Sequence, residues 1–206
     1  MEGLGCIIGF GIVIFLIVIL WPLWLGLGID AVVRHSINAR LEAKHQGVLK
    51  QQQLAAGEFS ERVATARRSL SGKPVASRLL LLNAMSALLE PIHYVGGIEG
   101  AVCIYFDSGN RVLDIHHWVG DDNSVPIPTD TIVAHALATG SHAVAIAHNH
   151  PNNNSVPSDR DVWHAAELID ALQAAGIGLV EDYVWCHNRY KSVLKTRRFK
   201  DLVRPV

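Results

Sequence analysis

The chain has 206 residues, enough for one modest domain and an appendage but not for two large catalytic domains. Its 18 lysines and arginines balance 19 aspartates and glutamates, so overall charge gives no bias towards nucleic acid or acidic partners. The three cysteines lie far apart and form no Cys-x-x-Cys pair, which argues against a disulfide framework and a cysteine zinc site.

The first segment, residues 1–29, is strongly apolar. No charged residue occurs from Gly3 to Ile29, and this run exceeds the ~20 residues that a helix needs to cross a bilayer. A cleaved signal peptide is the alternative, but it has a basic start and a shorter apolar core of about 7–15 residues. We therefore expect residues 3–29 to form a transmembrane anchor.

Basic residues next to this run predict its orientation. None precedes it, whereas Arg34, Arg40 and Lys44 follow it closely. Because basic flanks favour the cytoplasmic side, we expect a single-pass protein of the inner (plasma) membrane with a cytoplasmic catalytic domain. The basic tail that begins at Arg189 is consistent either with a solvated face or with contact to anionic lipid headgroups.

Residues 30–73 are polar and rich in alanine, a composition that favours helix. Their apolar stripe is weak, so we expect one or two exposed helices, broken near Gly57, that act as a stalk. The string Ser71-Gly72-Lys73-Pro74 predicts a helix end and a domain boundary, because glycine terminates helices and proline cannot continue them.

Residues 74–206 alternate helix and strand signals. A helix is predicted over 75–89, and two strands at 101–106 and 111–116 flank four turn formers, which indicates a β-hairpin. The remaining predictions are helices over 128–140 and 158–175 and strands over 143–147, 177–185 and 190–194. The predicted fold class is therefore α/β, with a mixed β-sheet and flanking helices.

The strongest chemical signal is the string Ala147-His148-Asn149-His150-Pro151. Residues two positions apart in an extended chain point the same way, so His148 and His150 can direct their imidazoles at one point. Asp161 follows in the first turn of the next predicted helix. Two prolines in the intervening loop limit its conformations, which favours a fixed position of the Asp161 carboxylate near the histidines. Two imidazoles and one carboxylate suit Zn²⁺ and leave a fourth position for water, as in catalytic sites.

Hydrolysis at such a site needs additional groups. A carboxylate that is not a ligand must carry the proton, and Glu99, beside the first predicted strand, is the candidate. The Ser158 hydroxyl is a candidate donor to the developing oxyanion. Ser158 and Asp161 also fit a capping box, so a purely structural interpretation of this pair stays open.

The spacing of these residues resembles the metal motif of the JAMM (MPN/JAB) metalloprotease family. The chain fits that motif at His148, His150, Ser158 and Asp161. The His-Asn-His-Pro string is similar to the RadC-like branch in particular, and the resemblance covers residues 79–193. That branch has its glutamate eight residues before the aspartate that closes the first strand, and counting back from Asp107 gives Glu99.

The resemblance implies a JAB/MPN-like fold, which is cytidine-deaminase-like, and zinc-dependent cleavage of a peptide or isopeptide bond, often at a ubiquitin-like tail. The expected partner is therefore a protein or peptide substrate, with a ubiquitin-like conjugate as one candidate. One position departs from the pattern. Tyr183 stands where the branch usually has histidine, after the aspartate matched by Asp182, and this leaves the supporting role of Asp182 open.

Two other functions stay open. RadC-like members have long carried a DNA-repair label, but the near-neutral charge and the lack of a helix-turn-helix motif argue against nucleic acid. Some members of the wider family are non-catalytic scaffolds that have lost their ligands, whereas this chain retains them. The leading hypothesis is a membrane-anchored zinc metallopeptidase or isopeptidase of unknown oligomeric state, with an anchor (1–29), a helical stalk (30–73) and a catalytic domain (74–206).

Overall fold

The computed structural model of the chain describes residues 4–94, 97–121, 124–152, 154–187 and 189–202, and describes side chains from residue 33 onwards. Contacts within the chain divide it into two units, residues 1–50 and 51–206. The described helices are α1 (Leu4–Leu70), α2 (Arg78–His93), α3 (Thr129–Thr139), α4 (Asp159–Ala174) and α5 (Arg197–Leu202). The described strands are β1 (Gly100–Phe106), β2 (Val112–Val119), β3 (Ala143–Asn149), β4 (Gly178–Cys186) and β5 (Arg189–Ser192).

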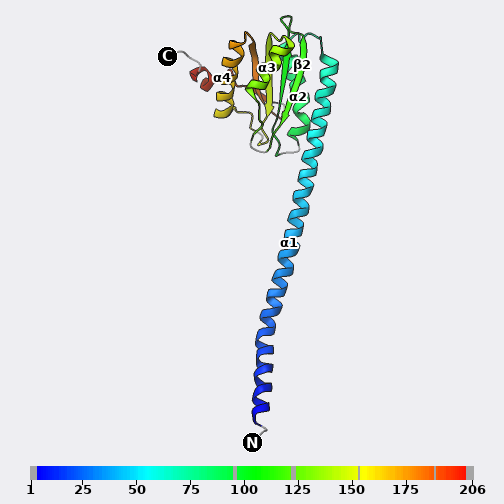
Figure 1. Cartoon of the computed structure of the whole chain (residues 1–206), viewed down its shortest axis with the longest axis vertical. Coiled ribbons are helices and arrows are strands. Elements are labelled where there is room, and N and C mark those ends of the chain that lie inside the picture. Colours follow the sequence, from blue (N-terminus) through cyan, green and yellow to red (C-terminus); the bar gives the residue numbers. More distant parts are fainter. Residues whose placement is uncertain (1–3, 95–96, 122–123, 153, 188, 203–206) are drawn as a thin grey trace. The chain divides into compact units, whose positions relative to one another are not determined.

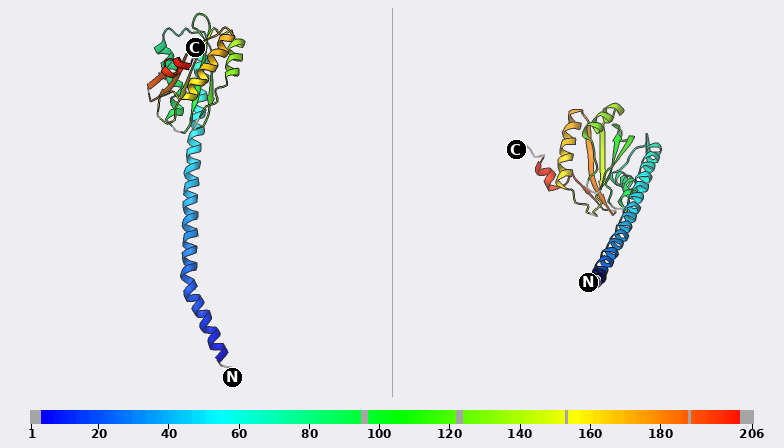
Figure 2. Two further views of the ribbon diagram at one scale, coloured as in Figure 1. Left: turned by 90° about the vertical axis from the view of Figure 1, so that its left-hand side faces the viewer. Right: turned by 60° about the horizontal axis from the view of Figure 1, so that its bottom comes forward.

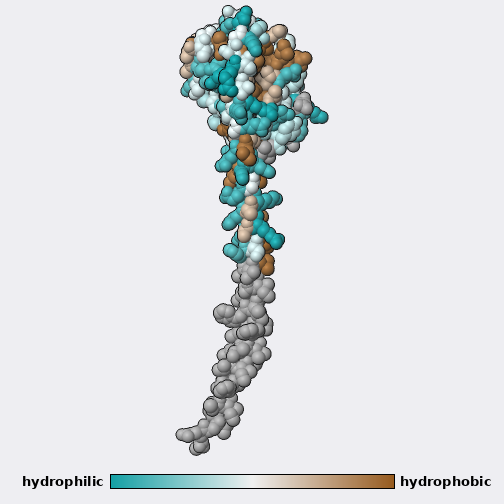
Figure 3. All heavy atoms as spheres, turned by 90° about the vertical axis from the view of Figure 1, so that its right-hand side faces the viewer, coloured by the Kyte–Doolittle hydropathy of each residue, from teal (hydrophilic) through white to brown (hydrophobic). Residues whose placement is uncertain are grey.

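The first unit contains the N-terminal part of α1. Over residues 33–50 exposed apolar side chains alternate with polar and charged ones (Figure 3). Among the residues whose side chains are described, no helix has the length and apolar character needed to cross a membrane. The predicted anchor, residues 3–29, lies outside those residues. The predicted location, an inner-membrane protein with a cytoplasmic catalytic domain, is therefore corrected. We do not retain that prediction.

The part of α1 beyond residue 50 belongs to the second unit. The predicted break near Gly57 is wrong, because α1 continues without interruption to Leu70. Ala55, Phe59 and Val63 are buried, and their spacing of four residues places them on one side of the helix. This part of α1 therefore packs in the core instead of forming an exposed stalk.

The second unit is built on a mixed five-stranded sheet with the order β2-β1-β3-β4-β5. The predicted hairpin is confirmed, since β1 pairs antiparallel with β2, and β1 also pairs antiparallel with β3. Strands β3 and β4 are parallel and are joined through α4, whereas β4 and β5 are antiparallel. The predicted α/β class with flanking helices is thus confirmed.

Helices cover both faces of this sheet (Figures 1 and 2). Alternate residues of a strand point to opposite faces, so Val102 and Ile104 pack with α2 and the end of α1, while Cys103 and Tyr105 pack with α3 and α4. We call these the α1–α2 face and the α3–α4 face. The position of a residue along its strand therefore tells which face its side chain lies on.

Helix α2 ends close to the start of β1. The sequence predicted its end before Pro91, but the helix includes Pro91 and continues to His93. This extra turn places Ile92 against Gly100, where an added Cβ would lie 2.2 Å from Ile92 Cδ1. A side chain at Gly100, the residue that follows Glu99, would therefore require the Ile92 side chain to move.

Candidate metal centre

Strand β3 supplies the first two candidate ligands. His148 is its penultimate residue and His150 directly follows the strand, and both side chains are buried. Their Nε2 atoms lie 3.2 Å apart. The predicted convergence of residues two positions apart is therefore present in the structure.

Asp161 reaches the histidines from the first turn of α4. Ser158 is the N-cap of this helix, and its Oγ accepts a hydrogen bond from the Asp161 backbone N–H at 3.2 Å. The carboxylate in turn accepts from the Ser158 backbone N–H at 2.6 Å and from the Ser158 hydroxyl at 2.7 Å. The capping box is thus formed, and it fixes the Asp161 carboxylate in place.

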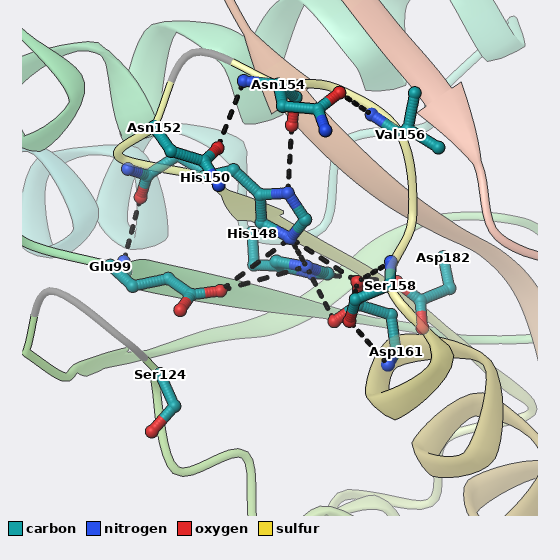
Figure 4. A network of polar contacts seen from close by, with 12 residues as sticks. Glu99, Ser124, His148, His150, Asn152, Asn154, Val156, Ser158, Asp161 and Asp182 are labelled. Atoms are coloured by element: carbon teal, nitrogen blue, oxygen red, sulfur yellow. Dashed lines mark hydrogen bonds and ion pairs between the residues drawn. The ribbon is translucent and has the colours of Figure 1, made fainter.

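The two imidazoles and the Asp161 carboxylate converge, with one carboxylate oxygen near each histidine (Figure 4). Asp161 Oδ1 lies 3.2 Å from His148 Nε2, and Asp161 Oδ2 lies 3.3 Å from His150 Nε2. Two ligands at about 2.0–2.1 Å from a tetrahedral zinc ion lie about 3.3–3.4 Å apart. The chemistry and the spacing of this donor set therefore fit a zinc-sized ion.

Glu99 lies slightly further from the same point. Its Oε1 is 3.9 Å from His148 Nε2 and 4.0 Å from His150 Nε2. Its carboxylate could also complete a three-ligand set with the histidines, because these ligand atoms lie within 4.8 Å of one another. The shorter distances favour Asp161 over Glu99 as the third ligand.

Each imidazole is oriented by an atom behind it. His150 Nδ1 lies 2.8 Å from the carbonyl oxygen of Asn154, so Nδ1 carries the hydrogen and the Nε2 lone pair faces the other two candidate ligands. His148 Nδ1 faces Asp182 Oδ1 at 4.0 Å, and these two buried atoms have no hydrogen-bond partner.

Asn149 holds the strand that carries Glu99. Its side chain is fully buried; its Oδ1 accepts from the Gly100 backbone N–H at 2.8 Å, and its Nδ2 donates to the Ile98 carbonyl at 3.0 Å. These two bonds hold the backbone of the residues immediately before and after Glu99. The sequence analysis missed this role, because it depends on contacts with residues far away in the sequence.

The departure at Tyr183 does not affect the metal-binding face. Asp182 and Tyr183 are neighbours on β4 and so point to opposite faces of the sheet. The Tyr183 ring packs in the α1–α2 core, and its hydroxyl accepts a hydrogen bond from Arg78. Asp182 lines the cavity of the centre, and its carboxylate faces His148.

The charges around the histidines favour a bound cation. Burial alone would lower the pKa of His148, but the carboxylates of Asp161, Asp182 and Glu99 outweigh it and raise that pKa. Burial raises the pKa of Asp182 to about 7 and also raises that of Glu99. The carboxyl groups thus favour positive charge at His148, while burial opposes negative charge on Asp182 and Glu99.

The candidate ligands open into a cavity of about 400 Å³. Glu99, Ser158 and the candidate ligands line its floor, and residues 124–128 form a wall that leads into α3. Arg160 and His164 also line it, and the His164 imidazole lies 3.0 Å from the Ile127 carbonyl oxygen. The cavity therefore lies directly beside the candidate ligands.

Comparison with known proteins was made for the whole chain. Residues 81–199 match the family model described as "RadC-like JAB domain". A UPF0758 protein of Lactococcus lactis is 26% identical over 158 residues, which cover 76% of this chain and 68% of that protein. A UPF0758 protein of Aquifex aeolicus is also 26% identical, over 171 residues that cover 81% of this chain and 69% of that protein.

Proposed function

The chain belongs to the RadC-like JAB domain family, and from this premise we propose that it is a zinc-dependent peptidase or isopeptidase. The observation that carries the proposal is the convergence of His148, His150 and the Asp161 carboxylate, with contacts of 3.2–3.3 Å, at a cavity that Glu99 also lines. An amide bond in a protein or peptide, with a ubiquitin-like conjugate as one candidate, is the proposed substrate.

The chain's own residues divide the work of hydrolysis. His148, His150 and Asp161 would hold the ion, which when bound acts as a Lewis acid and lowers the pKa of a coordinated water towards about 7. Glu99 would take the proton of the attacking water at its carboxylate and deliver it to the leaving amine. This carboxylate belongs to a buried residue that lines the cavity.

Ser158 has two roles in this proposal. Its hydroxyl donates to Asp161 and thereby fixes a ligand. It also lines the cavity, where a rotation of the hydroxyl would direct its hydrogen to the oxygen of a polarised carbonyl. The two roles are compatible, because the Asp161 carboxylate keeps its bond to the Ser158 backbone N–H.

Glu99→Gln in the full chain tests the proposal. We expect this variant to retain stoichiometric zinc and to lose hydrolysis by roughly 10²–10⁴-fold, because glutamine cannot accept the proton. Zinc content and cleavage of peptide and ubiquitin-like conjugate panels are measured on wild type, Glu99→Gln and the control Glu167→Gln, which changes an exposed glutamate of α4. A wild-type chain without stoichiometric zinc, or a fully active Glu99→Gln variant, would contradict the proposal.

A further inference from the structure

A second group of metal-ligating side chains lies on the α3–α4 face, apart from the centre. Asp114 and His116 are two residues apart on the edge strand β2 and so point to the same side, while His135 comes from α3 (Figure 1). One ligand atom from each of the three residues lies within 4.8 Å of the other two. We propose that they form a second divalent-metal site, which joins β2 to α3.

This group is separate from the candidate metal centre. Asp114 pairs with Tyr105 on β1, whereas His148 pairs with Ala101. The two groups therefore lie towards opposite ends of β1 and on different neighbouring strands. No side chain is shared between them, so each can be removed without touching the other.

The Asp114 carboxylate is oriented for binding an ion. Its Oδ1 accepts from the Arg67 Nε at 2.6 Å and from the Ile115 backbone N–H at 2.8 Å. Its Oδ2 faces the two imidazoles, 2.9 Å from His135 Nε2 and 3.5 Å from His116 Nε2. Such hydrogen bonds to the second oxygen are the usual support of a ligating carboxylate.

The two imidazoles lie close together, with ring centroids 3.9 Å apart. The 3.5 Å separation of His116 Nε2 from Asp114 Oδ2 exceeds the common N–H···O range of about 2.7–3.2 Å but is near the spacing of two ligands on one zinc ion, about 3.3–3.4 Å.

The site is open to solvent and lacks the features of a catalytic centre. The side chains of Asp114, His116 and His135 are 19%, 27% and 24% exposed, so an ion can enter and keep water on its remaining positions. The cavity of the candidate centre does not include these residues. The role that fits is a cross-link between an edge strand and the helix that follows the cavity wall.

A third group in the described residues does not support the same inference. His93, Cys186 and His187 also place ligand atoms within 4.8 Å of one another. However, His93 Nε2 already accepts a hydrogen bond from the His187 backbone N–H at 3.3 Å. This bond comes from a backbone N–H outside the group, whereas the hydrogen bond within the Asp114 group, between His135 Nε2 and Asp114 Oδ2 at 2.9 Å, joins two of the proposed ligands themselves.

Zinc counting on the full chain tests the proposal. Metal-free protein is dialysed against Zn²⁺, and bound zinc is measured for wild type, a His148→Ala/His150→Ala variant, His135→Gln, and the combination of all three changes. We expect His135→Gln to lose one equivalent relative to wild type, and the combined variant to lose one relative to the double variant. The control is His142→Gln, which changes an exposed histidine outside these groups.

A second measurement separates metal binding from failure to fold. In the His148→Ala/His150→Ala background, Zn²⁺ should raise the midpoint of thermal unfolding, and His135→Gln or His116→Gln should abolish that shift while leaving the metal-free midpoint within a few degrees. Equal zinc content with and without His135→Gln, together with an unchanged shift, would overturn this site. That result would leave the proposed hydrolase untouched, because the hydrolase depends on His148 and His150.

Discussion

The two faces of the sheet differ in what their side chains do. The α3–α4 face carries His148, Asp182 and the Asp114 group, where charged and ligating atoms face one another. The α1–α2 face carries Phe59, Ile92 and other apolar side chains that form the largest core cluster. Neighbouring residues of one strand thus contribute separately to chemistry and to stability. Substitutions on the α1–α2 face should change stability and leave the metal content of the folded protein alone.

Phe59→Ala should have the largest effect on stability. The ring is fully buried between α1, β1 and β2 and packs edge-on against His117 at 5.0 Å. Removing it leaves a cavity and should lower the free energy of unfolding by about 3–5 kcal/mol. Denaturant unfolding measures this loss, and zinc per folded chain should stay at the wild-type value.

Leu54→Ala is the matched control for this prediction. Leu54 lies on the same helix but is 65% exposed, so its removal should change stability by less than about 0.5 kcal/mol. A Phe59→Ala protein that stays folded but no longer binds zinc would break the separation of the two faces. It would mean that the position of α1 controls the centre.

Asn149→Ala tests a residue that connects the two faces. Asn149 points to the α1–α2 side but holds the backbone on both sides of Glu99. Its loss leaves the Gly100 N–H and the Ile98 carbonyl without these partners, which should cost about 1–3 kcal/mol of stability. Hydrolysis should fall as well, mainly in kcat, because the ligands remain and the proton carrier loses its fixed position.

The control for Asn149→Ala is Asn152→Ala. The Asn152 side chain accepts one exposed hydrogen bond from the Asn154 backbone N–H in the same loop. Its removal should therefore cost less stability than the loss of Asn149. If Asn149→Ala lowers stability but leaves kcat unchanged, Glu99 is held by other contacts, and the two faces are more independent than the structure indicates.

The candidate centre could be predicted from sequence because its signals are local. His148, His150 and Asp161 lie within one strand, one loop and one helix turn, and the capping box at Ser158 indicates where that turn begins. Glu99 could be found only by counting back from the end of the first strand. Strand β1 pairs with β3 without a register shift from Ala101 to Phe106, although its pairing with β2 shifts between Tyr105 and Phe106.

The rest could not be predicted because it depends on which elements pack together. The composition of residues 30–73 predicts helix, but only the fold shows that Phe59 and Val63 meet a sheet. The Asp114 group joins a strand to a helix whose first residue is Thr129, and no motif spacing relates the two elements. The described side chains, which begin at residue 33, provide no support for the predicted membrane location.

Tyr183→Phe should have the smallest effect and tests the alternation directly. The hydroxyl accepts from Arg78, a side chain that is 47% exposed and also pairs with Glu181 at 2.7 Å. Because water can take the place of the Tyr183 hydroxyl as an acceptor for the exposed Arg78 side chain, the free energy of unfolding should fall by less than about 1 kcal/mol. Zinc affinity should not change, since the ring lies on the face away from His148.

The contrast is Asp182→Asn, which should weaken zinc binding by about 10–100-fold if Asp182 supports His148. Equal effects of these two neighbouring substitutions on zinc affinity would refute the division between the faces.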